Sequence, residues 1–114
     1  MTTQLQDVPL ALLSDFDIVG DVGLVADPQQ RLLETLAEDP RDIVYTPHNG
    51  GHWLVTSHEL GREVLSDADL FGSFPIGIPA NMEQRPRLIP LESDAASHRR
   101  YRRLLLPIFE PAAV

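Results

Sequence analysis

The chain has 114 residues, a length that suits one small domain. Hydrophobic residues make up 43% of it and the formal net charge is −8, which is typical of an acidic globular protein and excludes a disordered chain. There is no cysteine, so disulfides and thiolate metal sites cannot form within the chain. The acidic balance argues against nucleic-acid binding through the bulk surface.

Residues 1–26 show apolar patches without a clear period, and we expect them to be extended and irregular. No basic segment precedes their short apolar run, so the pattern of a secretory signal is absent. No apolar stretch approaches the length needed to cross a bilayer. These features predict a soluble, cytoplasmic protein without membrane or nucleic-acid partners.

A helix is predicted to begin directly after Asp27. Aspartate suits the N-cap, and Pro28 suits the first helical position. Three leucines follow at helical spacing and give the helix one apolar stripe, which we expect to end near residues 39–40; they are Leu32, Leu33 and Leu36.

Two short strands are predicted next, over residues 43–46 and 52–56, because both runs are rich in β-branched and aromatic side chains. Asn49-Gly50-Gly51 lies between them and is typical of a hairpin turn that needs positive φ. Thr56 and Glu59 have the spacing of a capping box, which predicts a helix over residues 57–67. Its apolar positions, which we expect to face inward, are Leu60, Val64 and Leu65.

A long apolar loop is predicted over residues 68–92, and loops of this length in a compact domain are usually functional or mobile. Ser93 or Asp94 is expected to cap a last helix that continues to about Phe109, with a kink or an end at Pro107. The predicted fold class is therefore mainly α with a small β-hairpin.

The positive charge is concentrated in the last helix. Residues 1–96 hold 5 arginines against 16 acidic residues, a net of −11, whereas residues 97–114 hold 4 arginines against 1 acidic residue, a net of +3. On a helical wheel, one broad face is apolar and the opposite side is basic. The apolar side chains are Tyr101, Leu104, Leu105, Ile108 and Phe109, and the basic ones are Arg99, Arg100 and Arg103.

His98 and Arg102 are one helical turn apart, at the edge of that apolar face. One interpretation is a solvated basic flank, in which Arg102 pairs with an upstream acid. The other is a pair that donates hydrogen bonds to a buried anionic ligand such as a carboxylate or phosphate. The helix pattern alone favours the first interpretation.

The order "GGHWLVTSHELGREVLSDADLFGS", apolar loop, "LIPLESDAASHRRYRRLLLPIFEP" resembles the N-terminal portion of a soluble bacterial cytochrome P450 of the camphor-hydroxylating type. Pro90, Asp94, His98, Arg102 and Phe109 stand in the register of that family's C-helix motif. The resemblance implies helices A, B and C of the P450 fold within residues 1–114, with the chain truncated after the C helix. It also implies that His98 and Arg102 bind the propionates of haem b.

The same resemblance assigns two further sets of residues. The predicted loop would cover a small hydrophobic substrate, with contacts from Phe74, Ile76, Ile78, Met82 and Leu88. The tyrosine that donates to a substrate ketone in the camphor type is replaced by Pro86, which has no donor. The basic side would dock a ferredoxin-type electron donor, through Arg99, Arg100 and Arg103.

The resemblance implies a haem-thiolate monooxygenase that uses O₂, whose cysteine ligand and remaining chain would lie beyond residue 114, so these residues alone are expected to hold no catalytic residue and to be inactive. The alternative is a stand-alone small binding or regulatory domain without catalysis. A metal site at His48 and His52 is disfavoured, because the two glycines between them prevent the helix that such spacing requires.

Overall fold

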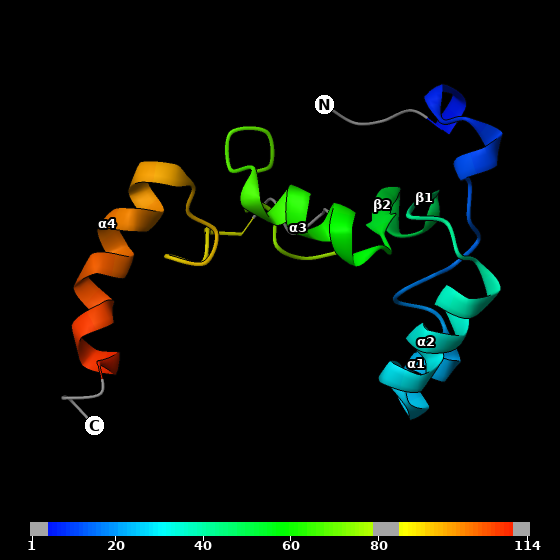
Figure 1. Ribbon diagram of the computed structural model, residues 1–114, viewed down its shortest axis with the longest axis horizontal. Helices are drawn as coiled ribbons and strands as arrows, with labels where there is room; N and C mark the ends of the chain where they lie inside the picture. Colours follow the sequence, from blue (N-terminus) through cyan, green and yellow to red (C-terminus); the bar gives the residue numbers. More distant parts are fainter. Residues whose placement is uncertain (1–4, 79–84, 111–114) are drawn as a thin grey trace. The chain divides into compact units, whose positions relative to one another are not determined.

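A computed structural model describes residues 5–78 and 85–110 (Figure 1). The chain divides into two compact units, Met1–Glu63 and Val64–Val114. The predicted fold class is confirmed, because the described residues are mostly helical and contain one two-stranded antiparallel sheet.

The first unit begins with two 3₁₀ turns, Leu5–Asp7 and Leu10–Leu12, and a short helix, α1, Val22–Ala26. The expectation of an irregular lead-in was therefore wrong for α1. This helix forms because the Asp21 carboxylate accepts a hydrogen bond from the Gly23 amide at 2.8 Å and so caps its first turn. Arg31 then donates to Asp21 at 2.9 Å and joins α1 to the next helix.

The predicted helix after Asp27 is confirmed as α2, Pro28–Glu38. Asp27 accepts from the Gln30 amide at 3.0 Å and Pro28 occupies the first turn, as the sequence pattern indicates. Its leucine stripe is poorly covered, with exposed fractions of 41% for Leu32, 62% for Leu33 and 38% for Leu36.

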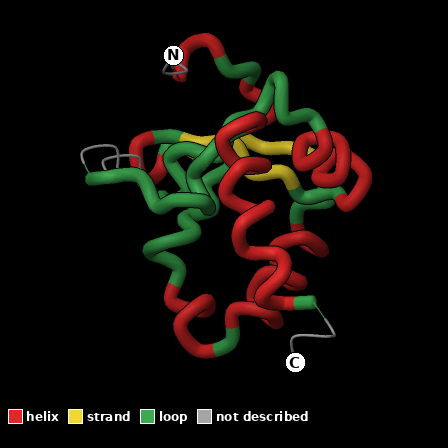
Figure 2. Tube along the Cα trace, turned by 90° about the vertical axis from the view of Figure 1, so that its left-hand side faces the viewer, coloured by secondary structure: helices red, strands yellow, loops and turns green. Residues whose placement is uncertain are grey.

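The hairpin is confirmed as β1, Ile43–Thr46, paired antiparallel with β2, His52–Val55 (Figure 2). Tyr45 lies opposite Trp53, and their rings meet edge to face with centroids 5.1 Å apart. The turn is a 3₁₀ turn, His48–Gly50, with φ of 55° at Asn49, 88° at Gly50 and 81° at Gly51. The need for positive φ at this turn was thus predicted correctly.

The lead-in packs beside β1, and three apolar side chains of this unit are buried. Val8, Val44 and Tyr45 are at most 6% exposed. The Ser14 amide donates to the Tyr45 carbonyl at 2.9 Å. Arg41 holds the same segment through its guanidinium, which donates to the Ala11 carbonyl at 2.5 Å and to the Leu13 carbonyl at 3.1 Å.

The helix after the hairpin, α3, spans His58–Ser66, and the division between the two units falls within it. The predicted capping box is wrong: the Ser57 hydroxyl accepts from the Leu60 amide at 3.3 Å, while the Thr56 hydroxyl donates to the Arg41 carbonyl. The Thr56 side chain therefore links the residue after β2 to the Arg41 backbone and does not cap α3. Leu65, expected to face inward, is 88% exposed.

In the second unit, the last helix, α4, spans Ala95–Leu105 and is followed by a 3₁₀ turn, Leu106–Phe109. The tightening lies at Pro107, which has no N–H for an α-helical hydrogen bond. Asp94 occupies the N-cap position, but its carboxylate makes no cap bond and instead accepts from the Ser73 amide at 2.7 Å. The predicted loop before α4 is confirmed, because the described residues from 72 to 78 and from 85 to 92 form no helix or strand.

Candidate functional site

His98 and Arg102 are one turn apart on α4, and both line one depression of the second unit. The loop before α4 forms one side of this depression, and α4 with the turn after it forms the other. His98 is half-buried and Arg102 is exposed. The lining residues are Pro90, Leu91, His98, Arg102, Leu105, Leu106 and Phe109. The site therefore combines an apolar wall with two nitrogen-bearing side chains.

The arginines of α4 have no anionic partner within the described residues. No carboxylate of residues 5–78 and 85–110 forms an ion pair with Arg99, Arg100, Arg102 or Arg103. The sequence interpretation in which Arg102 pairs with an upstream acid thus finds no support in this part of the chain. A guanidinium without an internal partner at an apolar depression is available to an external anion.

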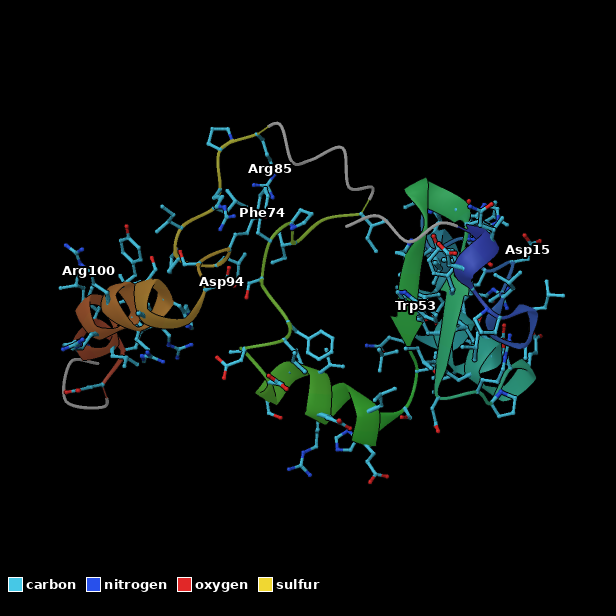
Figure 3. All side chains as sticks on the ribbon, turned by 90° about the horizontal axis from the view of Figure 1, so that it is seen from above. Asp15, Trp53, Phe74, Arg85, Asp94 and Arg100 are labelled. Carbon is cyan, nitrogen blue, oxygen red and sulfur yellow. The ribbon has the colours of Figure 1, made fainter. Side chains whose placement is uncertain are left out.

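The opposite side of α4 is basic and solvent-exposed, with Arg99, Arg100 and Arg103 on it; Figure 3 labels Arg100. The apolar face is also poorly covered. Leu104 is 71% exposed and Phe109 is 75% exposed, and only Tyr101 is half-buried. Inward packing of this face, which the helical wheel suggested, is not present within the described residues.

The predicted substrate-contact residues fall into three groups. Phe74 is half-buried, and the Arg87 guanidinium carbon lies 4.3 Å from the centre of its ring. Ile76, Ile78 and Leu88 are between 43% and 51% exposed. Met82 lies outside the described residues.

Glu92 brings two of these residues together, and the sequence analysis did not identify it. Its side chain is fully buried. One carboxylate oxygen accepts from the Ile76 amide at 3.0 Å, and the other accepts from the Leu88 amide at 2.7 Å. Arg85, which is labelled in Figure 3, donates to both oxygens, at 2.5 and 2.8 Å. We call these four residues the Glu92 clamp.

The pairing with Arg85 is the main reason that the pKa of Glu92 is lowered to about 2, and the two backbone amides add to it while burial opposes it. The pKa of Arg85 is raised for the same reason. In the sequence, the clamp is indicated only by Glu92 in the "PLESD" segment and by Arg85, which lies seven positions earlier. Local spacing does not predict such a contact, since it depends on how the loop folds back.

The two histidines of the hairpin, His48 and His52, differ in their contacts. The Nε2–H of His48 donates to the Asp15 carboxylate at 2.9 Å, and its Nδ1 lies 3.6 Å from an Asp17 carboxylate oxygen. The hydrogen bond with Asp15 is the main reason that the pKa of His48 is raised. His52 has both ring nitrogens buried without a partner among the described residues. Within those residues no group of His, Asp and Glu could hold a metal ion.

No helix in the described parts of the chain has the length and apolar character required to cross a membrane.

Comparison with known proteins points to one family. The chain is 29% identical to the probable cytochrome P450 127A1 of Sinorhizobium fredii over 94% of its own length and 28% of the relative. It is 32% identical to the steroid C26-monooxygenase of Mycolicibacterium smegmatis over 89% of its length and 27% of the relative. No family model matches.

The fold agrees with these relatives. The crystal structure of CYP101J2 covers 98% of this chain with a TM-score of 0.80 and 35% identity, and the match spans 29% of that protein. The chain thus spans somewhat more than a quarter of the length of the proteins it matches. It is homologous to the N-terminal part of bacterial cytochromes P450, as the sequence resemblance indicates.

Proposed function

We propose that this chain forms one wall of the haem pocket of a cytochrome P450 monooxygenase, with His98 and Arg102 binding the haem propionates. The observation that carries the proposal is the depression on which both side chains lie, next to apolar residues of α4 and the preceding loop. A propionate-bearing apolar ring requires this combination of an apolar surface and hydrogen-bond donors at its rim.

The haem would supply the oxygen chemistry when bound, and this requires a thiolate ligand to its iron. The chain has no cysteine, so the ligand would come from outside residues 1–114. The role proposed for this chain is therefore to bind and orient. Its exposed apolar side chains, including Leu104 and Phe109, would pack against the remainder of the P450 chain.

The loop before α4 is proposed to contact a small hydrophobic substrate. Phe74, Ile76, Ile78 and Leu88 supply apolar surface there, and Met82 remains a prediction from the sequence alone. Pro86 offers no side-chain donor at the position where a ketone would be anchored in the camphor type. One relative is a steroid monooxygenase, so we favour recognition of the substrate by apolar contact.

The haem role is tested in the haem-loaded protein that carries this chain by the substitution Arg102→Leu, with Arg103→Leu as the matched control. Both remove one arginine from α4, but only Arg102 lines the depression. We expect a loss of haem occupancy for Arg102→Leu and little change for Arg103→Leu, measured by the haem absorbance per protein. Equal occupancy in the two variants would contradict the propionate assignment.

The exposed arginines are proposed to dock a ferredoxin-type electron donor. Arg99, Arg100 and Arg103 are exposed and pair with no carboxylate of the described residues, so their charge is available to an acidic protein. Replacing Arg99 and Arg103 by glutamate should slow reduction by an acidic ferredoxin at low salt, and the difference should shrink as salt is added. Identical reduction rates at low salt would remove this docking surface.

A further inference from the structure

The Glu92 clamp is unusual because the buried group at its centre is a charge. Glu92 is fully buried, while its partner Arg85 retains 24% of its side-chain exposure. A buried carboxylate is strongly unfavourable unless its oxygens are satisfied. Each oxygen of Glu92 accepts one bond from Arg85 and one from a backbone amide, so both are satisfied.

The position of these bonds along the chain is what gives the clamp its effect. Ile76 lies before the segment 77–84, and Arg85 and Leu88 lie after it, so one carboxylate joins both flanks of that segment. Ile76 and Leu88 are themselves proposed substrate contacts. The clamp therefore determines the separation of two apolar side chains that come from different parts of the loop.

Two neighbouring contacts hold the loop further, and the first joins it to the residue before α4. Asp94 accepts from the Ser73 amide at 2.7 Å, and the Arg87 guanidinium lies over the Phe74 ring. Glu92 stands two residues before Asp94. The loop is thus hydrogen-bonded to the N-cap residue of α4, the helix that carries His98 and Arg102.

We propose that Glu92 is a positioning residue that determines which apolar molecules the loop accepts, by holding the Ile76 and Leu88 backbones at a fixed separation. This inference rests on the proposed function. Glu92 touches neither a substrate nor the haem in this role, and it acts through the two residues that it holds. A purely structural staple would hold the loop in the same way but would leave the choice among apolar molecules unchanged.

The test uses the haem-loaded protein that carries this chain, with Glu92→Gln as the main variant and Glu59→Gln as the matched control, since Glu59 is exposed on α3. Arg85→Lys is the second variant, because lysine keeps the positive charge opposite Glu92 but cannot donate to both carboxylate oxygens in the bidentate geometry of arginine. Three quantities are measured: amide hydrogen exchange at Ile76 and Leu88, haem occupancy, and the dissociation constants of cyclohexanol, norbornane and adamantane from the haem absorbance shift.

We expect Glu92→Gln to speed exchange of the two amides about tenfold or more. Glutamine keeps one acceptor oxygen, weaker than a carboxylate oxygen, and places an NH2 donor where the other oxygen accepted from a backbone amide and from Arg85. Haem occupancy should be unchanged, and the order of affinity among the three compounds should change. Arg85→Lys should give the same changes with smaller size, and Glu59→Gln should give none.

The outcomes separate the two proposals. Unchanged amide exchange in Glu92→Gln would overturn the clamp itself. Faster exchange with an unchanged order of affinity would overturn the positioning role, and Glu92 would then only stabilise the loop. If Glu92→Gln fails to fold, amide exchange and the order of affinity measured on Arg85→Lys test the clamp and the positioning role instead. If the parent protein binds no haem, the proposed function fails and the positioning role fails with it, while amide exchange still reports whether the clamp exists.

Discussion

The two units of the chain are stabilised in different ways. In the described part of Met1–Glu63, three apolar side chains are buried: Val8 in the lead-in, and Val44 and Tyr45 on β1. In the described part of Val64–Val114, the buried residues are polar, Glu92 and Ser93. The first unit therefore depends on apolar burial next to paired strands, and the second depends on a satisfied buried charge.

Because of this difference, the two units should respond differently to changes of pH and to the loss of a single side chain. Apolar burial changes little with pH or salt, and its loss leaves a cavity. A buried carboxylate that accepts from two amides and a guanidinium is strongly destabilised when one partner is removed. The remaining buried polar groups then lack a hydrogen-bond partner and cannot reach water. The loop proposed to contact substrate is held by the second kind of interaction.

The largest effect should follow from Tyr45→Ala in the first unit. Tyr45 is 4% exposed and packs against Trp53, so its removal should lower the free energy of unfolding of this unit by about 3 kcal/mol. Amide exchange in β1 and β2 measures the loss, with Val25→Ala, at an 86% exposed position, as the control. Equal acceleration of the Ile76 amide would contradict the separate stabilisation of the two units.

Acid should release the second unit's clamp. The pKa of Glu92 is lowered from an ordinary value of 4.5 to about 2, chiefly by Arg85. A lowered pKa means that the stabilisation is fully present above pH 4.5 and is lost as the pH falls toward 2. The NMR shifts of the Ile76 and Leu88 amides should stay constant down to about pH 4 and then change.

The Glu92→Gln variant provides the control for that titration, because glutamine does not ionise. Its Ile76 and Leu88 amide shifts should show no such transition. A midpoint close to pH 4.5 in the parent protein would mean that Arg85 does not stabilise the ionised carboxylate.

A smaller effect is expected from Asp27→Ala at the start of α2. Loss of its bond to the Gln30 amide should destabilise the helix by about 1 kcal/mol. Exchange of the first-turn amides of α2 should become several-fold faster. Gln29→Ala changes a side chain in the same turn that makes no cap bond, and equal effects in the two variants would rule out the cap as the cause.

The smallest effect concerns His48, which joins the lead-in to the hairpin turn. Its pKa is raised mainly by the hydrogen bond with Asp15 and further by the charge of Asp17. A raised pKa means that the stabilisation is fully present below pH 6.5 and is lost as the pH rises through the folded value. Asp15→Asn should lower the pKa of His48, as followed by its imidazole NMR signals, and Asp69→Asn should leave it in place.

Local signals predicted α2 and the hairpin well. Asp27 and Pro28 satisfy the needs of a helix start within a few residues, and the Asn49-Gly50-Gly51 turn needs only positive φ. The spacing of His98 and Arg102 likewise predicted that they are neighbours one helical turn apart on α4, and both line one depression. Each of these features depends on residues that are close in the chain.

Features that depend on distant partners were missed or misassigned. Thr56 was expected to cap α3, but its hydroxyl donates to the Arg41 carbonyl, 15 positions away. Ser93 or Asp94 was expected to cap α4; Asp94 occupies the N-cap position, but its side chain accepts from the Ser73 amide, 21 positions away. Both side chains have the right chemistry for a cap, and a competing backbone group took the hydrogen bond.

Three properties could be predicted from the amino-acid sequence: the chain is mainly helical with one hairpin, its net positive charge lies on the last helix, and it resembles the N-terminal part of bacterial cytochromes P450. Periodicity, turn chemistry and motif order are local properties, so they can be read from the chain. Only the tertiary structure showed the Glu92 clamp. A buried charge is tolerated only where several partners converge on it, and that convergence arises when a loop folds back on itself.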